Sequence, residues 1–263
     1  MRQWEDELAA AIHAAKEARK VIMEVYEQGF DVVMKEDHSP VTKADQRADA
    51  LIRQILHQRF PTHAFLTEES QDHLDRLENP YCWIVDPVDG TKDFVAKDDE
   101  FTTNIALAYH HQIVVGVVSI PARQEIYYAV RGQGAYFINA KGEATAIHVN
   151  EKRKDLTMLS SRFHVNDAEL VYLDQHRDLI SHHEHFGSAI KACRIAHGKA
   201  ELQFHIGPGT KEWDTAASQI IVEEAGGIYI DAKTHQPFLY NQEDVYHHNG
   251  FIVANLIDNI KGI

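Results

Sequence analysis

The sequence is poor in cysteine and has no long hydrophobic run. Only two cysteines, Cys82 and Cys193, occur among its 263 residues, and both lie in apolar or helical surroundings. We therefore expect buried, reduced thiols and a cytoplasmic protein, with peripheral association with the inner membrane left open. No segment approaches the ~20 apolar residues of a membrane span. The polar N-terminal segment also lacks the apolar core of a signal peptide.

Positive charge is scarce as well. The chain has 26 lysines and arginines against 40 acidic residues, which gives a formal net charge of −14. Proteins that bind polymeric nucleic acid present basic faces, so we expect no partner of this kind. A small anionic substrate would be repelled at long range, and local cations would have to capture it.

Helical and strand patterns alternate along the chain, which favours a layered α/β fold. With 44% hydrophobic residues, the chain can form one large domain or two tightly joined halves. A change of composition near residues 141–154 divides it into an N-terminal α+β subdomain (1–145) and a C-terminal α/β subdomain (146–263). The clearest predicted helices are 4–29, 45–60, 167–179, 188–197 and 214–225, and the clearest strands are 81–85, 101–109, 113–120, 125–130, 157–161, 202–206, 228–230 and 250–254.

The segment 81–94 is the most informative part of the sequence. An apolar run, Tyr81–Val85, reads as a buried strand and stops at Asp-Pro-Val-Asp-Gly, which is typical of a turn. Asp86 and Asp89 would repel each other there unless a cation joined them, and an all-oxygen cluster suits Mg²⁺. The amides of Gly90 and Thr91 would then face a phosphate at a helix start. The alternative is ordinary turn and capping chemistry, which the pattern alone leaves at even weight.

Two further acidic positions favour the metal site. Thr-Glu-Glu at residues 67–69 follows a short apolar stretch, and Trp-Asp-Thr-Ala-Ala at 213–217 opens a long helical pattern. With the segment 86–91, these motifs resemble those of the inositol monophosphatase superfamily of Mg²⁺-dependent, Li⁺-sensitive phosphatases. The resemblance covers essentially the whole chain. It implies a five-layer α-β-α-β-α sandwich with the metals where the two halves meet.

The resemblance also implies roles for individual residues. Glu68, Asp86, Asp89 and Asp214, with the Val88 carbonyl, would hold two or three Mg²⁺ ions. Asp45 and Thr91 would orient the attacking water, because a threonine hydroxyl can donate to a carboxylate and accept from water. Taken singly, Asp45 and Asp214 could also be plain helix-start residues. The residues expected to contact the substrate are Glu68, Val88, Asp89, Gly90, Thr91, Ser161, His164, Ser188, Lys191 and Asp214.

Within the superfamily, residues 35–45, 160–164 and 187–191 resemble the subgroup of CysQ-type 3′(2′),5′-bisphosphate nucleotidases. In that subgroup Lys191 would bind a nucleotide phosphate, and Ser161 and His164 would contact base or ribose. His205 stands where the subgroup commonly has arginine, and a neutral imidazole holds an anion less well than a guanidinium.

The resemblance predicts removal of the 3′-phosphate from 3′-phosphoadenosine 5′-phosphate, which gives AMP and clears a by-product of sulfate activation. An inositol or sugar monophosphatase on the same scaffold is the alternative. With either function, we expect a monomer or a homodimer. A non-catalytic metal or nucleotide sensor is disfavoured, since every expected chemical group is present.

Overall fold

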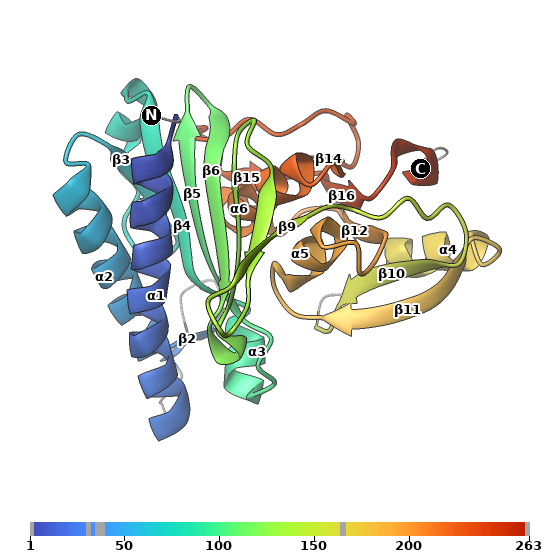
Figure 1. The fold of residues 1–263 in the computed structure, drawn as a ribbon, viewed down its shortest axis with the longest axis horizontal. Coiled ribbons are helices and arrows are strands. Elements are labelled where there is room, and N and C mark those ends of the chain that lie inside the picture. Colours follow the sequence, from blue (N-terminus) through green and yellow to red (C-terminus); the bar gives the residue numbers. More distant parts are fainter. Residues whose placement is uncertain (1–2, 30–32, 35–39, 164–166, 261–263) are drawn as a thin grey trace.

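The computed structural model describes residues 3–29, 33–34, 40–163 and 167–260. Its helices and sheets lie in five successive layers, which Figure 1 shows side by side. Helices α1 (Glu5–Gln28) and α2 (Lys43–Arg59) come first, followed by a large sheet, helices α5 (Ile190–Ala196) and α6 (Glu212–Glu224), a smaller sheet, and helix α4 (Asp167–Gln175). The predicted α-β-α-β-α sandwich is confirmed.

The large sheet has seven strands in the order β3-β4-β5-β6-β7-β8-β9. Only the β3–β4 pair is parallel; the other neighbours are antiparallel. An alanine stripe on α1, including Ala11, Ala14 and Ala18, is buried and lets α1 lie close to α2 and to the sheet. The strands are β3 (Ala64–Thr67), β4 (Tyr81–Asp89), β5 (Thr102–Tyr109), β6 (Gln112–Ile120), β7 (Glu125–Val130), β8 (Ala135–Ile138) and β9 (Ala144–Ile147).

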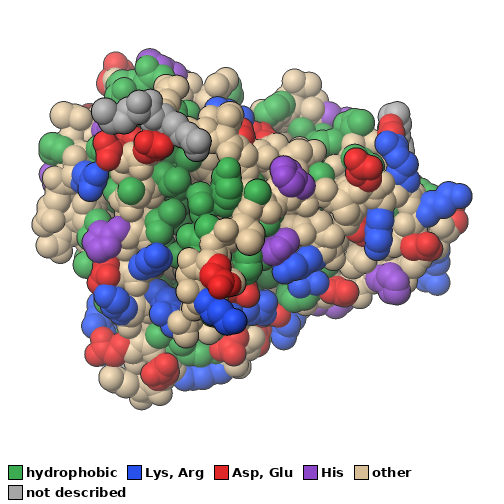
Figure 2. All heavy atoms as spheres, viewed as in Figure 1, with side chains coloured by type: hydrophobic (Ala, Val, Ile, Leu, Met, Phe, Trp, Pro, Cys, Tyr) green, Lys and Arg blue, Asp and Glu red, His purple; other side chains and the backbone are tan. Residues whose placement is uncertain are grey.

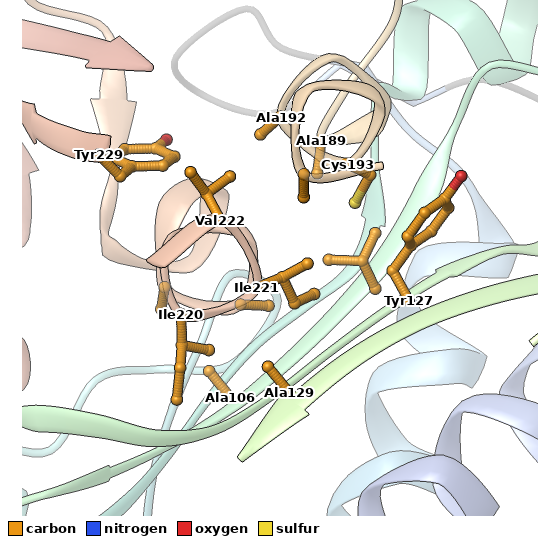
Figure 3. Packing of buried hydrophobic residues seen from close by; sticks show 14 of the residues in the cluster. Ala106, Tyr127, Ala129, Ala189, Ala192, Cys193, Ile220, Ile221, Val222 and Tyr229 are labelled. Atoms are coloured by element: carbon orange, nitrogen blue, oxygen red, sulfur yellow. The ribbon is translucent and has the colours of Figure 1, made fainter. Parts of the chain in front are cut away.

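Helix α6 covers the other face of the large sheet, although it comes from the far end of the chain. In Figure 3, Ile220 points toward Ala106 and Ala129 of the sheet, while Val222 faces Tyr229 of the smaller sheet. Gly116 on β6 leaves no room for a side chain, because a Cβ there would overlap Ile220 and lie 2.6 Å from the Ala217 carbonyl oxygen. The helix therefore rests directly on the strand.

The smaller sheet has five strands in the order β11-β10-β12-β16-β14, with both parallel and antiparallel pairs. Two short pairs of strands, β1 with β2 and β13 with β15, belong to neither the large sheet nor the smaller sheet. The bounds are β1 (Val33–Met34), β2 (Pro40–Val41), β10 (Leu156–Ser161), β11 (Ile180–Phe186), β12 (Leu202–Ile206), β13 (Thr210–Lys211), β14 (Ile228–Asp231), β15 (Tyr246–His247) and β16 (Gly250–Ala254), with short helices α3 (Thr91–Ala96), η1 (Leu74–Glu78), η2 (Pro121–Arg123) and η3 (Ile257–Ile260).

Several boundaries differ from the sequence-based expectations. Strand β4 does not stop at Val85 but continues through Asp89, and the predicted helix 167–179 ends at Gln175. The histidine-rich segment after it forms edge strand β11, and β8 and β9 extend the large sheet beyond the predicted strands. The predicted boundary at residue 145 falls inside β9. The division at 145 stays a prediction about how the chain is organised.

The charged side chains on the surface and the two buried cysteines agree with what the composition predicts. On the face drawn in Figure 2, acidic and basic side chains are interspersed, and hydrophobic side chains gather near its middle. Cys82 and Cys193 are both buried free thiols. In the described ranges no helix combines the length and the hydrophobicity that crossing a bilayer requires.

Candidate active site

Three carboxylates meet between the two halves of the chain. Asp86 and Asp89 lie on β4, and Asp214 lies in the first turn of α6. Each offers an oxygen within 4.8 Å of the other two, and this is the only such cluster of metal-ligating side chains among the described residues. The sequence-based prediction had placed them together, and the structure brings them together.

A bulge in β4 aims both aspartates the same way. Asp86 pairs with Asn104 and Asp89 with Thr102, so three steps along β4 oppose two steps along β5. In a regular strand, residues three apart point to opposite faces, and one extra residue restores a common face. The Pro87-Val88 pair, which looked like a turn in the sequence, is this bulge.

The carboxylates destabilise one another in the absence of a cation. Burial, and then the charges of Glu68, Asp89 and Asp214, raise the pKa of Asp86 well above its usual range. Burial and the charges of Asp89 and Glu68 do the same to the pKa of Asp214. A hard divalent cation would reverse both effects, because it favours the ionised form of every oxygen it binds. The all-oxygen donor set fits Mg²⁺.

Neighbouring groups orient each carboxylate. Asp89 Oδ2 accepts hydrogen bonds from Thr102 Oγ1 at 3.3 Å, Asn104 Nδ2 at 3.2 Å and the Ala189 amide at 2.9 Å. Asp214 Oδ2 accepts from the Lys211 amide at 2.6 Å, so Asp214 also caps α6. Asp86 Oδ1 accepts from the Val88 amide at 3.0 Å.

Asp45 and Thr91 lie beside this cluster. Thr91 Oγ1 is 3.4 Å from Asp45 Oδ1 and 3.3 Å from the Val88 carbonyl oxygen. Asp45 also forms a capping box at the start of α2, because its Oδ2 accepts from the Thr42 amide at 2.8 Å and from Thr42 Oγ1 at 2.6 Å. Burial raises the pKa of Asp45. Asp45 thus has both the capping contact and the threonine contact that the sequence suggested as alternatives.

The candidate substrate residues of the C-terminal half gather near one turn. Ser161 pairs with Phe186 across β10 and β11, and Ser188 Oγ donates to the Glu100 carbonyl oxygen at 3.0 Å. Gly90 lies against Ser188, since a Cβ on Gly90 would be 3.2 Å from the Ser188 Cβ. His164 lies outside the described residues.

Lys191 is buried beneath this turn. Its ammonium donates to the carbonyl oxygens of Ser188 at 2.7 Å and Phe186 at 3.1 Å. Burial lowers the pKa of Lys191, while the charges of Asp89 and Asp93 oppose that effect. In this structure the lysine holds backbone carbonyls, and its charge also favours the ionised form of Asp89.

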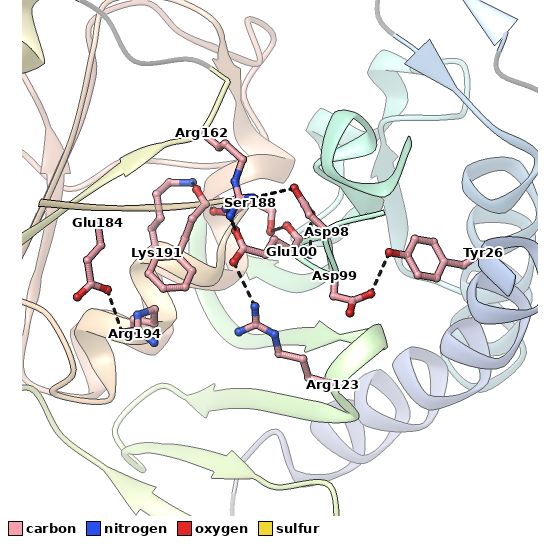
Figure 4. A network of polar contacts seen from close by, with 12 residues as sticks. Tyr26, Asp98, Asp99, Glu100, Arg123, Arg162, Glu184, Ser188, Lys191 and Arg194 are labelled. Atoms are coloured by element: carbon pink, nitrogen blue, oxygen red, sulfur yellow. Dashed lines mark hydrogen bonds and ion pairs between the residues drawn. The ribbon is translucent and has the colours of Figure 1, made fainter. Parts of the chain in front are cut away.

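Sequence reasoning missed Glu100, which joins the two halves. Its buried carboxylate accepts from Arg162 at 2.8 Å, from the Gly187 amide at 2.9 Å and from Arg123 at 3.3 Å. Figure 4 shows this group beside Ser188 and Lys191, with Arg162 also reaching Asp98. Glu100 stands among polar residues in the sequence, and no local pattern marks an acid that pairs with arginines 23 and 62 positions away.

The model of the inositol monophosphatase family matches residues 3–261. The chain belongs to this family. It is 36% identical over 246 residues to the 3′(2′),5′-bisphosphate nucleotidase CysQ of Escherichia coli, covering 91% of this chain and 96% of that protein. The Nus factor SuhB of Pasteurella multocida is 33% identical over 85% of this chain and 84% of its own length.

A solved structure agrees with this assignment. CysQ from Bacteroides thetaiotaomicron superposes with a TM-score of 0.83 at 32% identity, covering 97% of this chain and 99% of that one. Family membership and these relatives make the chain a phosphatase. Enzymes of this family are metal-dependent, and the cluster of Asp86, Asp89 and Asp214 is a suitable place for the metal.

Proposed function

We propose that this phosphatase uses Mg²⁺ to remove the 3′-phosphate from 3′-phosphoadenosine 5′-phosphate, giving AMP and phosphate. The observation that carries the proposal is the 36% identity to a 3′(2′),5′-bisphosphate nucleotidase over nearly the full length of both chains. The carboxylate cluster supports it, because phosphate hydrolysis needs cations where the chain itself supplies mainly acids.

The proposed metal ligands are Glu68, Asp86, Asp89 and Asp214, with the Val88 carbonyl, for two or three ions. Bound there, Mg²⁺ would supply Lewis-acid stabilisation of the phosphoryl oxygens and a more acidic water. Glu68 is not part of the tight cluster, but its charge acts on both Asp86 and Asp214.

The proposed proton path uses Thr91 and Asp45. Thr91 donates to Asp45 and can accept from the attacking water, so the water's lone pair is directed at phosphorus. Gly90 and Thr91 begin helix α3, where unpaired amides favour an anion. Ser161, His164, Ser188 and Lys191 remain the proposed residues on the nucleotide side.

A second candidate is an inositol or sugar monophosphatase. His205, in place of an arginine, favours it, because a substrate with one phosphate needs no second anion contact. The family's own description also names inositol monophosphatase. A cytoplasmic location and a monomer or homodimer remain predictions.

A panel of substrates tests the proposal. Phosphate release would be measured on 3′-phosphoadenosine 5′-phosphate, inositol 1-phosphate and fructose 1,6-bisphosphate, with Mg²⁺, after EDTA, and with millimolar Li⁺. We expect kcat/KM to be at least about tenfold higher on the bisphosphate nucleotide. Activity should vanish with EDTA, return with Mg²⁺ and fall with Li⁺. Faster release from inositol phosphate would favour the second candidate, and no release from any of the three would overturn both candidates.

A further inference from the structure

Lysine and arginine side chains near the carboxylate cluster differ in the groups that already bind them. Lys191 is buried and bound to two carbonyl oxygens. Arg162 pairs with Glu100 at 2.8 Å and with Asp98 at 3.5 Å. Lys211 forms no ion pair with any residue in the part of the chain that the structure describes, although its charge partly opposes the rise in the pKa of Asp214 that burial and Asp89 cause. Of these three cations, Lys211 is the one without an ion-pair or carbonyl partner among the described residues.

Two aromatic rings hold the Lys211 side chain. Its Nζ lies 5.1 Å from the ring centre of Trp213 and 5.4 Å from that of Tyr246. Tyr246 stands opposite Lys211 in the β13–β15 pair, so the strand register fixes the ring beside the lysine. Ring faces attract an ammonium group and restrict its position, but they do not neutralise its charge. The ammonium is thus held in place while it stays available to an anion.

The position of Lys211 relative to the cluster is fixed by the backbone. Its own amide donates to Asp214 Oδ2 at 2.6 Å, and it directly precedes α6. Gly209, two residues earlier, lies near His205, since a Cβ on Gly209 would be 3.8 Å from His205 Nε2. The loop between β12 and β13 therefore passes beside His205 two residues before Lys211.

We propose that Lys211 determines substrate specificity by binding the second, non-reacting phosphate of a nucleotide that carries two phosphate monoesters. The inference rests on the proposed function, because it assumes that the reacting phosphate binds at the carboxylate cluster. A second phosphate adds about two negative charges to a ligand that must approach a chain of net charge −14. A positioned ammonium without a carboxylate partner compensates that charge through charge-assisted hydrogen bonds.

The test compares two substrates that differ only in the second phosphate: 3′-phosphoadenosine 5′-phosphate and 3′-AMP. Lys211→Met keeps the length of the side chain and its ring contacts but removes the charge. We expect kcat/KM for the bisphosphate to fall about 10- to 100-fold, mainly through KM, while the value for 3′-AMP changes less than about threefold. AMP, which retains only the non-reacting phosphate, should inhibit the variant more weakly.

Three further variants complete the experiment. Lys211→Arg should keep most of the preference for the bisphosphate, and Tyr246→Leu should lose part of it, because Tyr246 restrains the lysine. Lys199→Met is the matched control, since Lys199, in the loop between α5 and β12, also has its Nζ over a ring, 5.6 Å from the centre of Phe137. Lys199→Met should leave both substrates unchanged.

The outcomes separate the inference from the proposed function. An equal fall on both substrates would mean that Lys211 acts through Asp214, and an unchanged preference would mean that it does not meet the second phosphate; either overturns the inference alone. A wild-type enzyme that treats the two substrates alike would overturn the inference together with the proposed bisphosphate specificity.

Discussion

At the residue scale, Asp86 is the carboxylate on which the metal site most depends. It is buried, and four neighbouring acids raise its pKa. Asp86→Asn keeps the volume but removes one charge from the cluster. We expect phosphatase activity at saturating Mg²⁺ to fall by more than about 100-fold.

The same substitution should stabilise the metal-free protein. Without a cation, the buried negative charges repel one another, and Asp86→Asn relieves part of that repulsion. In EDTA the melting temperature should therefore rise, although activity is lost. Asp174→Asn, at an exposed position on α4, is the control and should change neither quantity. Near-native turnover of Asp86→Asn would show that the metal assignment is wrong.

Glu169 on α4 makes stability depend on pH. Its side chain is 1% exposed, and burial raises its pKa from 4.5 to about 7, although Ser160 and Lys191 favour the ionised form. Because the folded pKa is the higher one, the folded protein binds more protons between these values. The contribution of Glu169 to the free energy of unfolding is therefore fully present below pH 4.5, and it is lost as the pH rises through about 7.

Glu169→Gln removes this dependence while it keeps an oxygen that can face Ser160. At pH 8.5 the free energy of unfolding should rise by up to about 3 kcal/mol relative to the wild type. At pH 5 the difference should be small. Urea unfolding at both pH values measures this, and an equal difference at the two values would mean that the effect is not one of ionisation.

At the element scale, the contact of α6 with β6 places Asp214. Gly116 allows the helix to touch the strand, and an added methyl group would meet Ile220 and the Ala217 carbonyl. Gly116→Ala should push α6 away from the sheet and cost about 1–3 kcal/mol of stability. Because α6 carries Asp214, the Mg²⁺ concentration for half-maximal activity should rise as well.

Gly29→Ala is the matched control for this substitution. No atom lies within 4 Å of a Cβ there, and the cost should come only from the positive φ of 87°. Its Mg²⁺ dependence should equal that of the wild type. If Gly116→Ala also leaves the Mg²⁺ dependence unchanged, the helix contact does not position the metal ligand.

At the scale of the whole molecule, the two halves of the sequence complete each other. The face of the large sheet that carries Ala106 and Ala129 is covered by α6, which comes from the C-terminal half. The Glu100 carboxylate binds Arg162 and the Gly187 amide from that half. The subdomains proposed from the sequence should therefore not fold independently.

Expression of fragments tests this dependence. Fragment 1–145 should aggregate or lack a cooperative thermal transition, because the apolar sheet face is exposed without α6. Fragment 1–150, which keeps all of β9, should behave in the same way, and co-expression with 146–263 should restore a folded complex. A cooperatively folding fragment 1–145 would contradict the prediction.

The sequence by itself determined the layered α/β class, the main helices and most central strands, because their hydrophobic periodicity is local. It also placed Asp86, Asp89 and Asp214 in one cluster, through three motifs in a fixed order. It did not reveal that Pro87-Val88 is a bulge, because Asp-Pro and Asp-Gly pairs also form turns. It missed β11 because a histidine-rich strand at a sheet edge lacks apolar alternation.

Only the tertiary structure decided which charges face one another. Glu100 and Arg162 are 62 residues apart, and Lys211 meets Tyr246 only through the β13–β15 pair. The resemblance assigned Lys191 to a nucleotide phosphate, and the fold gives its ammonium two carbonyl partners. The physical reason is that burial and partners, which set the effect of a charge, arise from contacts between distant segments, whereas a motif records only neighbours along the chain.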